Sequence, residues 1–499
     1  MKKLHRLASI GLITAALLGS QYPAFAEQKH NINLWPKAEA PIKDSTEFNA
    51  KLEAILQKMT LEEKVGQIMQ AEIQTVTPED IKKYHLGSVL NGGGSMPNRI
   101  DNAKPKDWVE FLDALYIASM DTSDGKQAIP IFWGTDAVHG HNNLTGATLF
   151  PHNMGLGAMH NADLIRQIGA ATAKEVRSTG TEWVFAPTLA VAQNDRWGRT
   201  YESYSEDPKL VAEYATAMVE GLQGKVNSAE FLAGDRVIAT AKHFLADGGT
   251  DGGDDQGNAR ISEKELIKIH NAGYVPALDA GVQTVMASFS EWNGEKMHGN
   301  KYLLTDVLKD RMGFDGLVVG DWNGHGQVPG CTNDSCAQAI NAGIDLLMVT
   351  NDWKSMIDNT LKQVKSGEIS QARLDDAVRR ILRVKMRAHL WDKKPSQRAF
   401  AGDESVVGSA EHRAIARQAV RESLVLLKNN DKLLPINPTK TILVAGDGAD
   451  NIGKQAGGWS VWWQGVNDAA ENHRFPGATS IYAGINSAVT AAGGKAILS

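Results

Sequence analysis

The stretch 313–322 reads Gly-Phe-Asp-Gly-Leu-Val-Val-Gly-Asp-Trp, an apolar run that follows turn residues and ends on an acid and an indole. A short run of this kind is typical of a strand buried on both faces of a parallel sheet. Six further runs of this type occur at 87–91, 129–136, 183–187, 237–243, 284–290 and 344–349. We therefore predict strands at these six places and at 316–322.

Helical patterns separate these runs. One apolar helical face is formed by Leu374, Val378, Ile381 and Leu382. Thr60 and Glu63 fit a capping box that opens another helix. Strands and helices that alternate in this way predict an α/β fold, a (β/α)8 TIM-like barrel, which either hides an eighth strand in its pattern or is incomplete.

The predicted strands turn polar where they end. The polar ends are Gly134-Thr135-Asp136, Lys242-His243, Ser288-Phe289-Ser290 and Gly320-Asp321-Trp322. In a barrel these ends meet on one face, where active sites form. Taken singly, Asp321 fits a helix N-cap, and Lys242 with His243 fits a buried salt bridge, so each residue alone favours a structural role.

The two ends of the chain differ from the barrel region. Residues 1–26 have a basic start, a short apolar run and an Ala-Phe-Ala site, which predict a signal peptide and a secreted protein, periplasmic or extracellular. The predicted barrel spans 27–391, and a polar linker spans 392–412. Residues 413–499 then predict the N-terminal part of an α/β sandwich domain, with a helix at 414–427, a strand at 441–445 and a new strand opening at 495–499. We expect the chain to end within this domain.

Composition and missing motifs narrow the function. A net charge of −6 argues against a nucleic-acid partner, and only the signal peptide suggests a membrane contact. The loop at 446–451 lacks the third glycine of a dinucleotide motif, and no Walker loop, Gly-x-Ser-x-Gly or His-Glu-x-x-His occurs. We therefore expect no cofactor. Cys331 and Cys336 fit a local disulfide after export, with a metal-binding pair as the alternative.

Several motifs, in this order, resemble glycoside hydrolase family 3, and within it exo-acting β-glucosidases and β-glucan exohydrolases. They are Gly134-Thr135-Asp136-Ala137-Val138-His139-Gly140-His141-Asn142, Arg196-Trp197-Gly198-Arg199, Lys242-His243-Phe244 with Asp247-Gly248-Gly249-Thr250, Met286 with Ser288, Gly320-Asp321-Trp322, and Gly457-Gly458-Trp459 with Trp463-Gln464-Gly465. The resemblance runs from about Leu61 to the C-terminus.

The resemblance implies a role for each matching residue. Asp321 matches the catalytic nucleophile. The residues that match those holding the non-reducing-end glucose in the −1 subsite are Asp136, Arg199, Lys242 and His243, and Met286 matches a residue that lines the same pocket. Trp322 and Trp463 match the two indoles around the +1 sugar, and Trp459 supports this clamp.

Two positions depart from the family pattern. Phe289 stands where plant relatives carry a tyrosine, so a hydroxyl near the nucleophile is lost. The family's acid/base glutamate falls beyond Ser499 when counted from Asp321. None of the acids in residues 413–499 lies in the sequence context of the family's acid/base. These acids include Glu422, Asp447, Asp450, Asp468 and Glu471. A histidine acid/base, as in the hexosaminidase branch, also fits poorly, because Leu245-Ala246-Asp247 follows Phe244.

The resemblance implies an enzyme that hydrolyses terminal β-D-glucosyl residues of β-glucosides and β-glucan oligosaccharides, with retention and without a metal. Two alternatives stay open. One is a catalytically impaired glucan-binding fragment that lacks the general acid/base. The other is phosphorolysis, which would need a phosphate site at the pocket rim.

Overall fold

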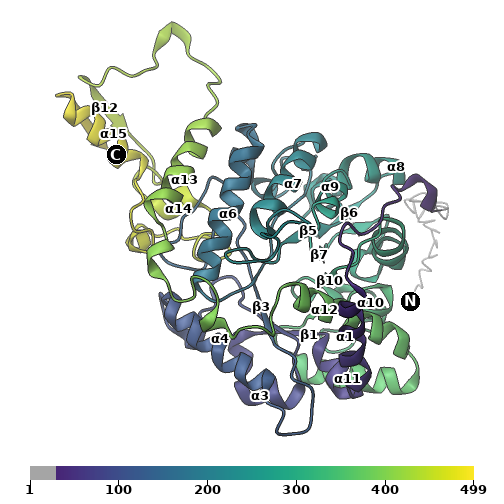
Figure 1. The fold of residues 1–499 in the computed structure, drawn as a ribbon. Helices are drawn as coiled ribbons and strands as arrows, with labels where there is room; N and C mark the ends of the chain where they lie inside the picture. Colours follow the sequence, from purple (N-terminus) through teal and green to yellow (C-terminus); the bar gives the residue numbers. More distant parts are fainter. Residues whose placement is uncertain (1–29) are drawn as a thin grey trace, which may run out of the picture. The chain divides into compact units, whose positions relative to one another are not determined.

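Residues 30–499 contain a closed barrel of eight parallel strands (Figure 1). They are β1(Met69–Glu72), β2(Ser88–Leu90), β3(Phe132–Thr135), β4(Trp183–Val184), β5(Thr240–Phe244), β7(Thr284–Ala287), β10(Leu317–Val319) and β11(Leu347–Met348). Two ladders run in the orders β11-β1-β2-β3-β4 and β10-β7-β5. The bridges Trp183–Ile238 and Val319–Leu346 join the two ladders, so the predicted barrel is confirmed.

This computed structural model describes residues 30–499. Ile32–Ser499 forms one compact unit, and the predicted signal peptide lies outside the described residues. None of the helices in 30–499 is long and apolar enough to cross a bilayer.

The seven predicted strands are present, and β1 is the eighth. The sequence hid β1 because its residues are Met-Gln-Ala-Glu and not an apolar run. Gln70 and Glu72 are nevertheless buried, and Gln70 Nε2 donates to Ser88 Oγ at 2.8 Å. A polar pair inside the barrel thus replaces the apolar contact that sequence patterns detect.

Helices follow the strands and cover the barrel. They include α2(Leu61–Gln67), α3(Pro78–Tyr84), α4(Pro105–Met120), α6(Ala162–Ser178), α7(Pro208–Gln223), α9(Tyr274–Asp279), the π-helix η9(Tyr302–Arg311), α10(Ala337–Ala342), α11(Trp353–Ser366) and α12(Gln371–Arg387). The capping box of Thr60 and Glu63 opens α2, as predicted. The predicted apolar face of α12 is buried in the core.

The stretch between α12 and the next helix is fixed to the barrel by ion pairs. Lys394 Nζ lies 2.8 Å from Asp113, and Arg398 Nη1 lies 2.8 Å from the buried Glu182. α13(Ala410–Ser423) then packs on α6 and on α5(Asn153–Ala158). The division into a barrel, a linker and a second domain at 391 and 412 stays a prediction.

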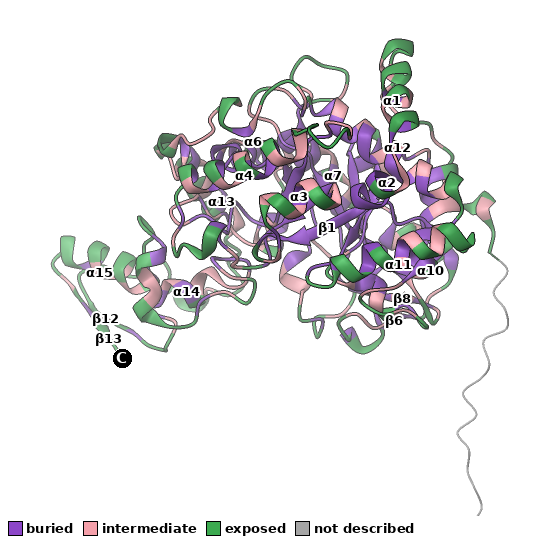
Figure 2. Cartoon of the chain, turned by 90° about the horizontal axis from the view of Figure 1, so that it is seen from below, coloured by how far each residue is buried: buried purple, intermediate pink, exposed green. Residues whose placement is uncertain are grey.

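The last segment of the chain forms a small parallel βαβ unit. β12(Thr441–Val444) pairs with β13(Lys495–Leu498), and α15(Ile481–Ala491) packs on β13. The strands predicted at 441–445 and 495–499 are therefore confirmed. The helix predicted at 414–427 is wrong at its end: α13 stops at Ser423, and 424–427 is exposed and has no regular secondary structure. Leu-Val-Leu-Leu is an apolar run that suits a buried strand as well as a helix. Much of α15 is also exposed (Figure 2).

Cys331 and Cys336 form a disulfide with an S–S distance of 2.09 Å. The expected local disulfide is present, in the loop between β10 and α10. Residues 30–499 contain no group of three or more His, Cys, Asp or Glu side chains suited to a metal ion.

Candidate active site

A cavity of about 610 Å³ lies at the C-terminal ends of the barrel strands. All nine predicted site residues line it: Asp136, Arg199, Lys242, His243, Met286, Asp321, Trp322, Trp459 and Trp463. The barrel supplies the first seven, and the loop at 457–465 supplies Trp459 and Trp463. The structure therefore brings together residues that lie up to 327 positions apart in the sequence (463 minus 136).

Asp321 follows β10 and is fixed through both its backbone and its carboxylate. Its N–H donates to His298 Nε2 at 2.9 Å, and its Oδ1 accepts from Trp322 N–H at 2.7 Å. Its Oδ2 lies 3.6 Å from His243 Nε2. The side chain is 14% exposed, so a ligand in the cavity can reach a carboxylate whose orientation is already set.

His243, at the end of β5, is oriented by a buried carboxylate. Its Nδ1 donates to Asp247 Oδ2 at 2.6 Å, and Arg199 Nη2 lies 3.3 Å from its Nε2. Because a guanidinium can only donate, Nε2 is the acceptor of that contact and the ring proton sits on Nδ1. Burial alone would raise the pKa of Asp247. The contacts with His243 and Arg199 outweigh burial, so the pKa of Asp247 lies below the usual range.

Arg199 forms a bidentate pair with Glu202. The two contacts are 2.7 Å from Nε and 2.9 Å from Nη2, and Glu202 has no exposed surface. Burial opposes ionisation of Glu202, yet the guanidinium lowers its pKa to about 2. Burial also opposes the charge on Arg199. The attraction to Glu202 outweighs this effect of burial and raises the pKa of Arg199. The cavity therefore contains a fixed, permanently charged fork of donors.

Asp136 and Lys242 form a second ion pair on the cavity wall. Lys242 Nζ donates to Asp136 Oδ1 at 2.9 Å and lies 5.3 Å from the centroid of the Trp459 ring. Burial raises the pKa of Asp136 although Lys242 opposes this. A carboxylate and an ammonium held side by side can accept from one ligand hydroxyl and donate to another.

Three tryptophans form the apolar part of the wall. Trp322 and Trp463 are 41% and 49% exposed, whereas Trp459 is buried, with its ring centroid 6.4 Å from that of Trp463. The glycine loop Gly92–Gly94 after β2 supports them. A Cβ on Gly92 would lie 2.7 Å from Trp322, and a Cβ on Gly93 would lie 2.5 Å from Trp463 Cβ. Only glycine allows these indoles to approach so closely.

Two histidines of the barrel hold the loop at 457–465. His152 Nε2 donates to Gly458 O at 2.9 Å, and His139 Nε2 lies 2.9 Å from Trp459 O. The two imidazole centroids are 4.1 Å apart. Burial, with His152 next, lowers the pKa of His139 to about 4. His139 thus anchors the loop that carries Trp459 and Trp463.

Several residues around the cavity were missed as site residues by the sequence analysis. They are Glu202, Asp247, His298, Gly92–Gly94, Asp255, Gln256 and Gln327. The glycine run directly after a predicted strand was a usable signal. The roles of Glu202 and His298 left no local signal, because each acts through a partner that only the fold brings near.

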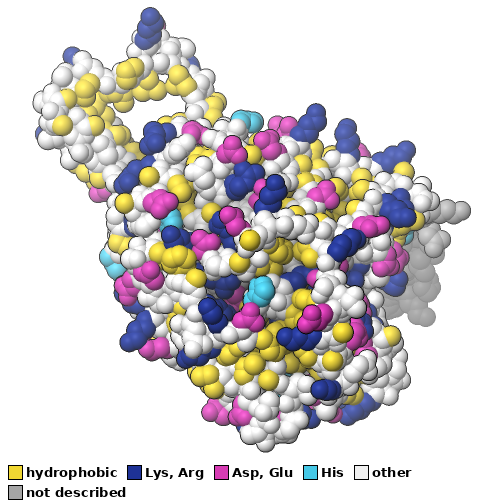
Figure 3. Space-filling view, in the orientation of Figure 1, with side chains coloured by type: hydrophobic (Ala, Val, Ile, Leu, Met, Phe, Trp, Pro, Cys, Tyr) yellow, Lys and Arg dark blue, Asp and Glu magenta, His cyan; other side chains and the backbone are white. Residues whose placement is uncertain are grey.

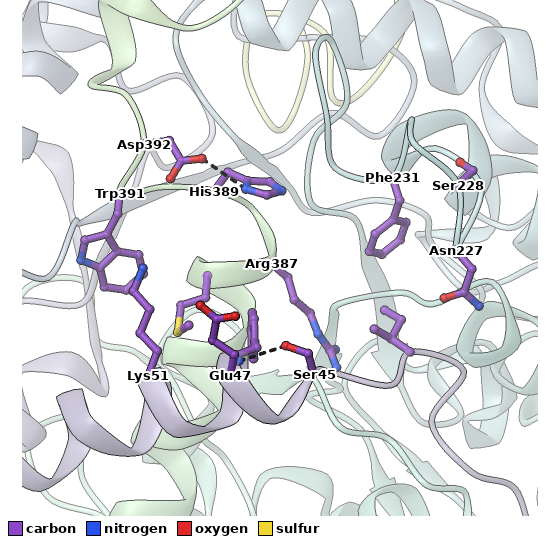
Figure 4. Close-up of a pocket in the computed structure, with 13 residues that line it drawn as sticks. Ser45, Glu47, Lys51, Asn227, Ser228, Phe231, Arg387, His389, Trp391 and Asp392 are labelled. Carbon is purple, nitrogen blue, oxygen red and sulfur yellow. Dashed lines mark hydrogen bonds and ion pairs between the residues drawn. The ribbon is translucent and has the colours of Figure 1, made fainter.

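A second pocket of about 460 Å³ lies away from this cavity, between α1(Thr46–Lys58), the loop at 227–231 and the end of α12 (Figure 4). Three of its charged groups have ion-pair partners. Arg387 pairs with Asp44 and Asp315, and His389 Nδ1 lies 3.3 Å from Asp392. The lining of this pocket includes Glu47, Asp392 and Trp391, but none of the nine predicted site residues.

No acid/base residue emerges from the carboxylates of the described chain. Those that line the cavity are Asp136, Asp255 and Asp321. Asp255 accepts from Trp197 Nε1 at 3.0 Å. The acids of residues 413–499 named above do not line the cavity.

The fold and the cavity define a class: a (β/α)8-barrel protein with a strand-end pocket that combines carboxylates, fixed cations and exposed indole faces, as a sugar ring requires. Residues 60–384 match the model of the glycosyl hydrolase family 3 N terminal domain. The chain belongs to this family, which confirms the resemblance.

Known proteins similar to the chain carry related names. The lysosomal beta glucosidase of Dictyostelium discoideum is 33% identical over 455 residues, which cover 86% of this chain and 55% of that protein. The periplasmic beta-glucosidase of Salmonella typhimurium is 31% identical over 472 residues, covering 91% and 56%. The crystal structure of the exo-1,3/1,4-beta-glucanase ExoP from a Pseudoalteromonas species is 55% identical with a TM-score of 0.90, covering 93% and 58%. The chain spans about half the length of the curated relatives it matches.

Proposed function

We propose that the protein is a retaining, exo-acting β-glucosidase or β-glucan exohydrolase. It removes terminal β-D-glucosyl residues from β-glucosides and β-glucan oligosaccharides. The observation that carries the proposal is Asp321, held at a barrel strand end beside an exposed indole, in a cavity that contains two further buried ion pairs. The names of the Salmonella and Pseudoalteromonas relatives support it.

Asp321 is the nucleophile of the proposed reaction. Because Oδ1 accepts from Trp322 N–H, Oδ2 is the oxygen that attacks C1 of the sugar. The bond from C1 to the leaving oxygen breaks, and that oxygen takes a proton from the solvent, which the attacking water returns in the second step. Water then attacks C1 from the opposite face, loses a proton and frees the carboxylate. Two inversions give net retention of the β configuration.

The other cavity residues bind the substrate. Asp136 and Lys242 hold neighbouring hydroxyls of the −1 sugar, and Arg199 and His243 contact it beside the nucleophile. Met286 lines this end of the pocket. Trp322 and Trp463 stack on the +1 sugar, and Trp459 supports Trp463 from behind.

The alternative is a catalytically impaired glucan-binding fragment. One observation favours it. No carboxylate of residues 413–499 lines the cavity, so none of them can act there as the general acid. General acid catalysis contributes about 10²–10⁴-fold, and a good aryl leaving group needs it least. An aryl β-glucoside and cellobiose therefore separate the cases. Turnover of the aryl glucoside alone indicates a missing proton donor, and turnover of both indicates that one is present.

Two points support a proposal for the cellular location of the protein. The predicted signal peptide indicates export, and the Salmonella relative is named a periplasmic enzyme. We propose that this protein acts outside the cytoplasm, in the periplasm or beyond it.

The first prediction tests the nucleophile. Asp321→Ala should lower kcat on an aryl β-glucoside by at least about 10⁴-fold, as removal of a nucleophile or its partner does elsewhere. Added azide should restore turnover and give the α-glucosyl azide, because azide enters from the face that the carboxylate has left. The products are followed by proton NMR of the anomeric signal.

The matched control is Asp195→Ala, which removes an exposed acid of the barrel and should leave kcat unchanged. Near-normal turnover by Asp321→Ala, or a β-configured azide product, would contradict the assignment.

A further inference from the structure

We propose that His298 is a positioning residue, which fixes the nucleophile Asp321 by accepting a hydrogen bond from the backbone N–H of Asp321. This inference rests on the proposed function. His298 lies in the 3-10 turn η8(Met297–Gly299), between β7 and β10, and is 1% exposed. Its Nε2 accepts from Asp321 N–H at 2.9 Å, and its Nδ1 lies 2.9 Å from Ser288 O.

These two partners define the protonation state of the ring. A backbone N–H can only donate, and a carbonyl oxygen can only accept. His298 must therefore be neutral with its proton on Nδ1. Burial, with His325 next, lowers the pKa of His298 to about 3, so the ring keeps this form across the neutral range. A proton on Nε2 would face the Asp321 N–H and break the contact.

The imidazole links the ends of two neighbouring barrel strands. Ser288 follows β7 and its own N–H donates to Phe244 O at 2.6 Å, while Asp321 follows β10. β7 and β10 pair only up to Met286 and Val319, so His298 continues their connection beyond the ladder. The backbone of Asp321 is thus tied to two strands of the barrel and not only to its own.

Close packing keeps the ring in place. A Cβ on Gly324 would lie 2.4 Å from the His298 ring, and a Cβ on Gly320 would lie 3.5 Å from it. Gly324, two residues after Trp322, therefore leaves room for this imidazole, and Gly320 lies at an ordinary contact distance from it. The ring therefore fixes the position of the Asp321 backbone relative to the cavity.

A displaced nucleophile should affect the reaction more than substrate binding. The residues that hold the sugar hydroxyls, Asp136, Lys242 and Arg199, are fixed by one another and by Glu202, whereas His298 bonds to Ser288 and Asp321. A misplacement of about 1 Å between reacting atoms lowers rates by about 10²-fold. We therefore expect kcat for formation of the glycosyl-enzyme to fall, with KM little changed.

Two substitutions separate the contacts of the ring. The amide nitrogen of asparagine in His298→Asn can replace Nδ1 and donate to Ser288 O, but nothing then accepts from Asp321 N–H. The amide oxygen of glutamine in His298→Gln can replace Nε2 and accept from Asp321 N–H. We expect His298→Asn to lose about 10²-fold in kcat and His298→Gln to retain most of the activity. Labelling of Asp321 by a 2-deoxy-2-fluoro glucoside should slow in the same order.

A role limited to stability is tested by His141→Asn, which removes another fully buried imidazole whose pKa burial lowers to about 3. This control should lower Tm without lowering kcat. If the three variants lose kcat only in proportion to Tm, His298 has no positioning role.

Hydrogen exchange at the Asp321 amide decides the inference without turnover. His298→Asn should speed this exchange, and His298→Gln should leave it close to that of the unchanged protein. A protein that turns over no β-glucoside would refute the proposed function, while slow exchange at Asp321 that depends on an acceptor at residue 298 would still support the contact. Equal exchange in both variants would overturn the inference.

Discussion

Each cation at the cavity wall has a buried carboxylate that fixes it. Arg199 is held by Glu202 and Lys242 by Asp136, and the neutral ring of His243 donates to Asp247. Removing one member of such a buried pair leaves an uncompensated charge in a medium that stabilises it poorly. The residues that would touch substrate and those behind them therefore act as units. Their effects should not add independently in double variants.

Glu202 provides the clearest test of this coupling. Glu202→Gln keeps the shape of the side chain and removes its charge, so Arg199 loses the partner that fixes its fork. We expect the free energy of unfolding to fall by about 3 kcal/mol, as for other broken buried ion pairs. The kcat/KM for β-glucosides should fall as well. Urea unfolding and steady-state kinetics measure the two effects, and Glu213→Gln, an exposed change on α7, is the control.

The same pair predicts a pH dependence. The pKa of Glu202 is about 2 in the folded protein, against an ordinary value of 4.5. The folded state therefore binds fewer protons than the unfolded state between these values, and stability rises with pH there. The stabilisation by the pair is complete above pH 4.5 and is lost as the pH falls towards 2. The difference in unfolding free energy between the original protein and Glu202→Gln should shrink over this range. A constant difference would contradict the pair's ionisation.

At the scale of elements, two loops that meet over the barrel shape the open side of the cavity. The glycine loop Gly92–Gly94 comes from the barrel, and the loop at 457–465 comes from the segment after α13. A Cβ on Gly94 would lie 1.8 Å from the Trp462 ring, and Val461 N–H donates to Asn142 O at 3.0 Å. The backbone of one loop thus determines where the indoles of the other can lie.

Gly93→Ala should displace Trp463, because its Cβ would lie 2.5 Å from Trp463 Cβ and 3.1 Å from Trp463 N. Loss of one stacking contact is worth about 0.5–1.5 kcal/mol, so kcat/KM for a β-linked glucose disaccharide should fall by about 10-fold or less. β-Glucosyl fluoride has no ring in the +1 subsite, and its kcat/KM should not change. Both are followed by steady-state release of glucose or fluoride.

The control for this prediction is Gly448→Ala, where the added Cβ would meet nothing within 4 Å. Equal losses on the disaccharide and the fluoride would show that Gly93 does not act through the +1 stack.

What the sequence could predict at this scale depended on local pattern. The strand before Asp321 was predicted because Leu-Val-Val is a local apolar run. β1 was not predicted, because Gln70 and Glu72 are polar residues that are buried inside the barrel. The predicted site residues were found from motifs and their order along the chain. His298 and Glu202 were not predicted as site residues, because a contact to a backbone amide or to another buried side chain leaves no pattern in the sequence. Residues proposed to bind the sugar are thus easier to predict from the sequence than the residues that position them.

At the scale of the whole molecule, apolar exposure is concentrated after α13. Leu424, Val425, Leu426 and Leu427 are 75%, 62%, 65% and 91% exposed, in a stretch without regular secondary structure. Further exposed apolar residues of this segment are Leu433, Leu443, Ile481, Ile497 and Leu498. Figure 3 shows hydrophobic side chains gathered in yellow patches on the arch at the upper left. An exposed apolar run beside a two-stranded sheet invites pairing with other chains.

We therefore expect this 499-residue chain to aggregate, or to lose residues beyond Ser423 to proteases. α13 is anchored by His412 Nδ1, 2.7 Å from the buried Glu175, so cleavage by thermolysin should begin after Ser423, at the exposed leucines. The barrel should survive as a resistant fragment, because its core is continuous. Mass spectrometry of the fragments and light scattering test this expectation.

Cleavage there also has a functional consequence. Trp459 and Trp463 lie beyond the cut, on a loop that His139, His152 and the Asn142 carbonyl hold to the barrel. Loss of the cut segment should therefore reduce turnover of disaccharides before the barrel unfolds. Leu427→Lys places a charge at the most exposed of the four positions and should delay aggregation without changing kcat. A monodisperse, protease-resistant preparation of the unchanged chain would contradict the prediction, because it would mean that these leucines are covered in solution.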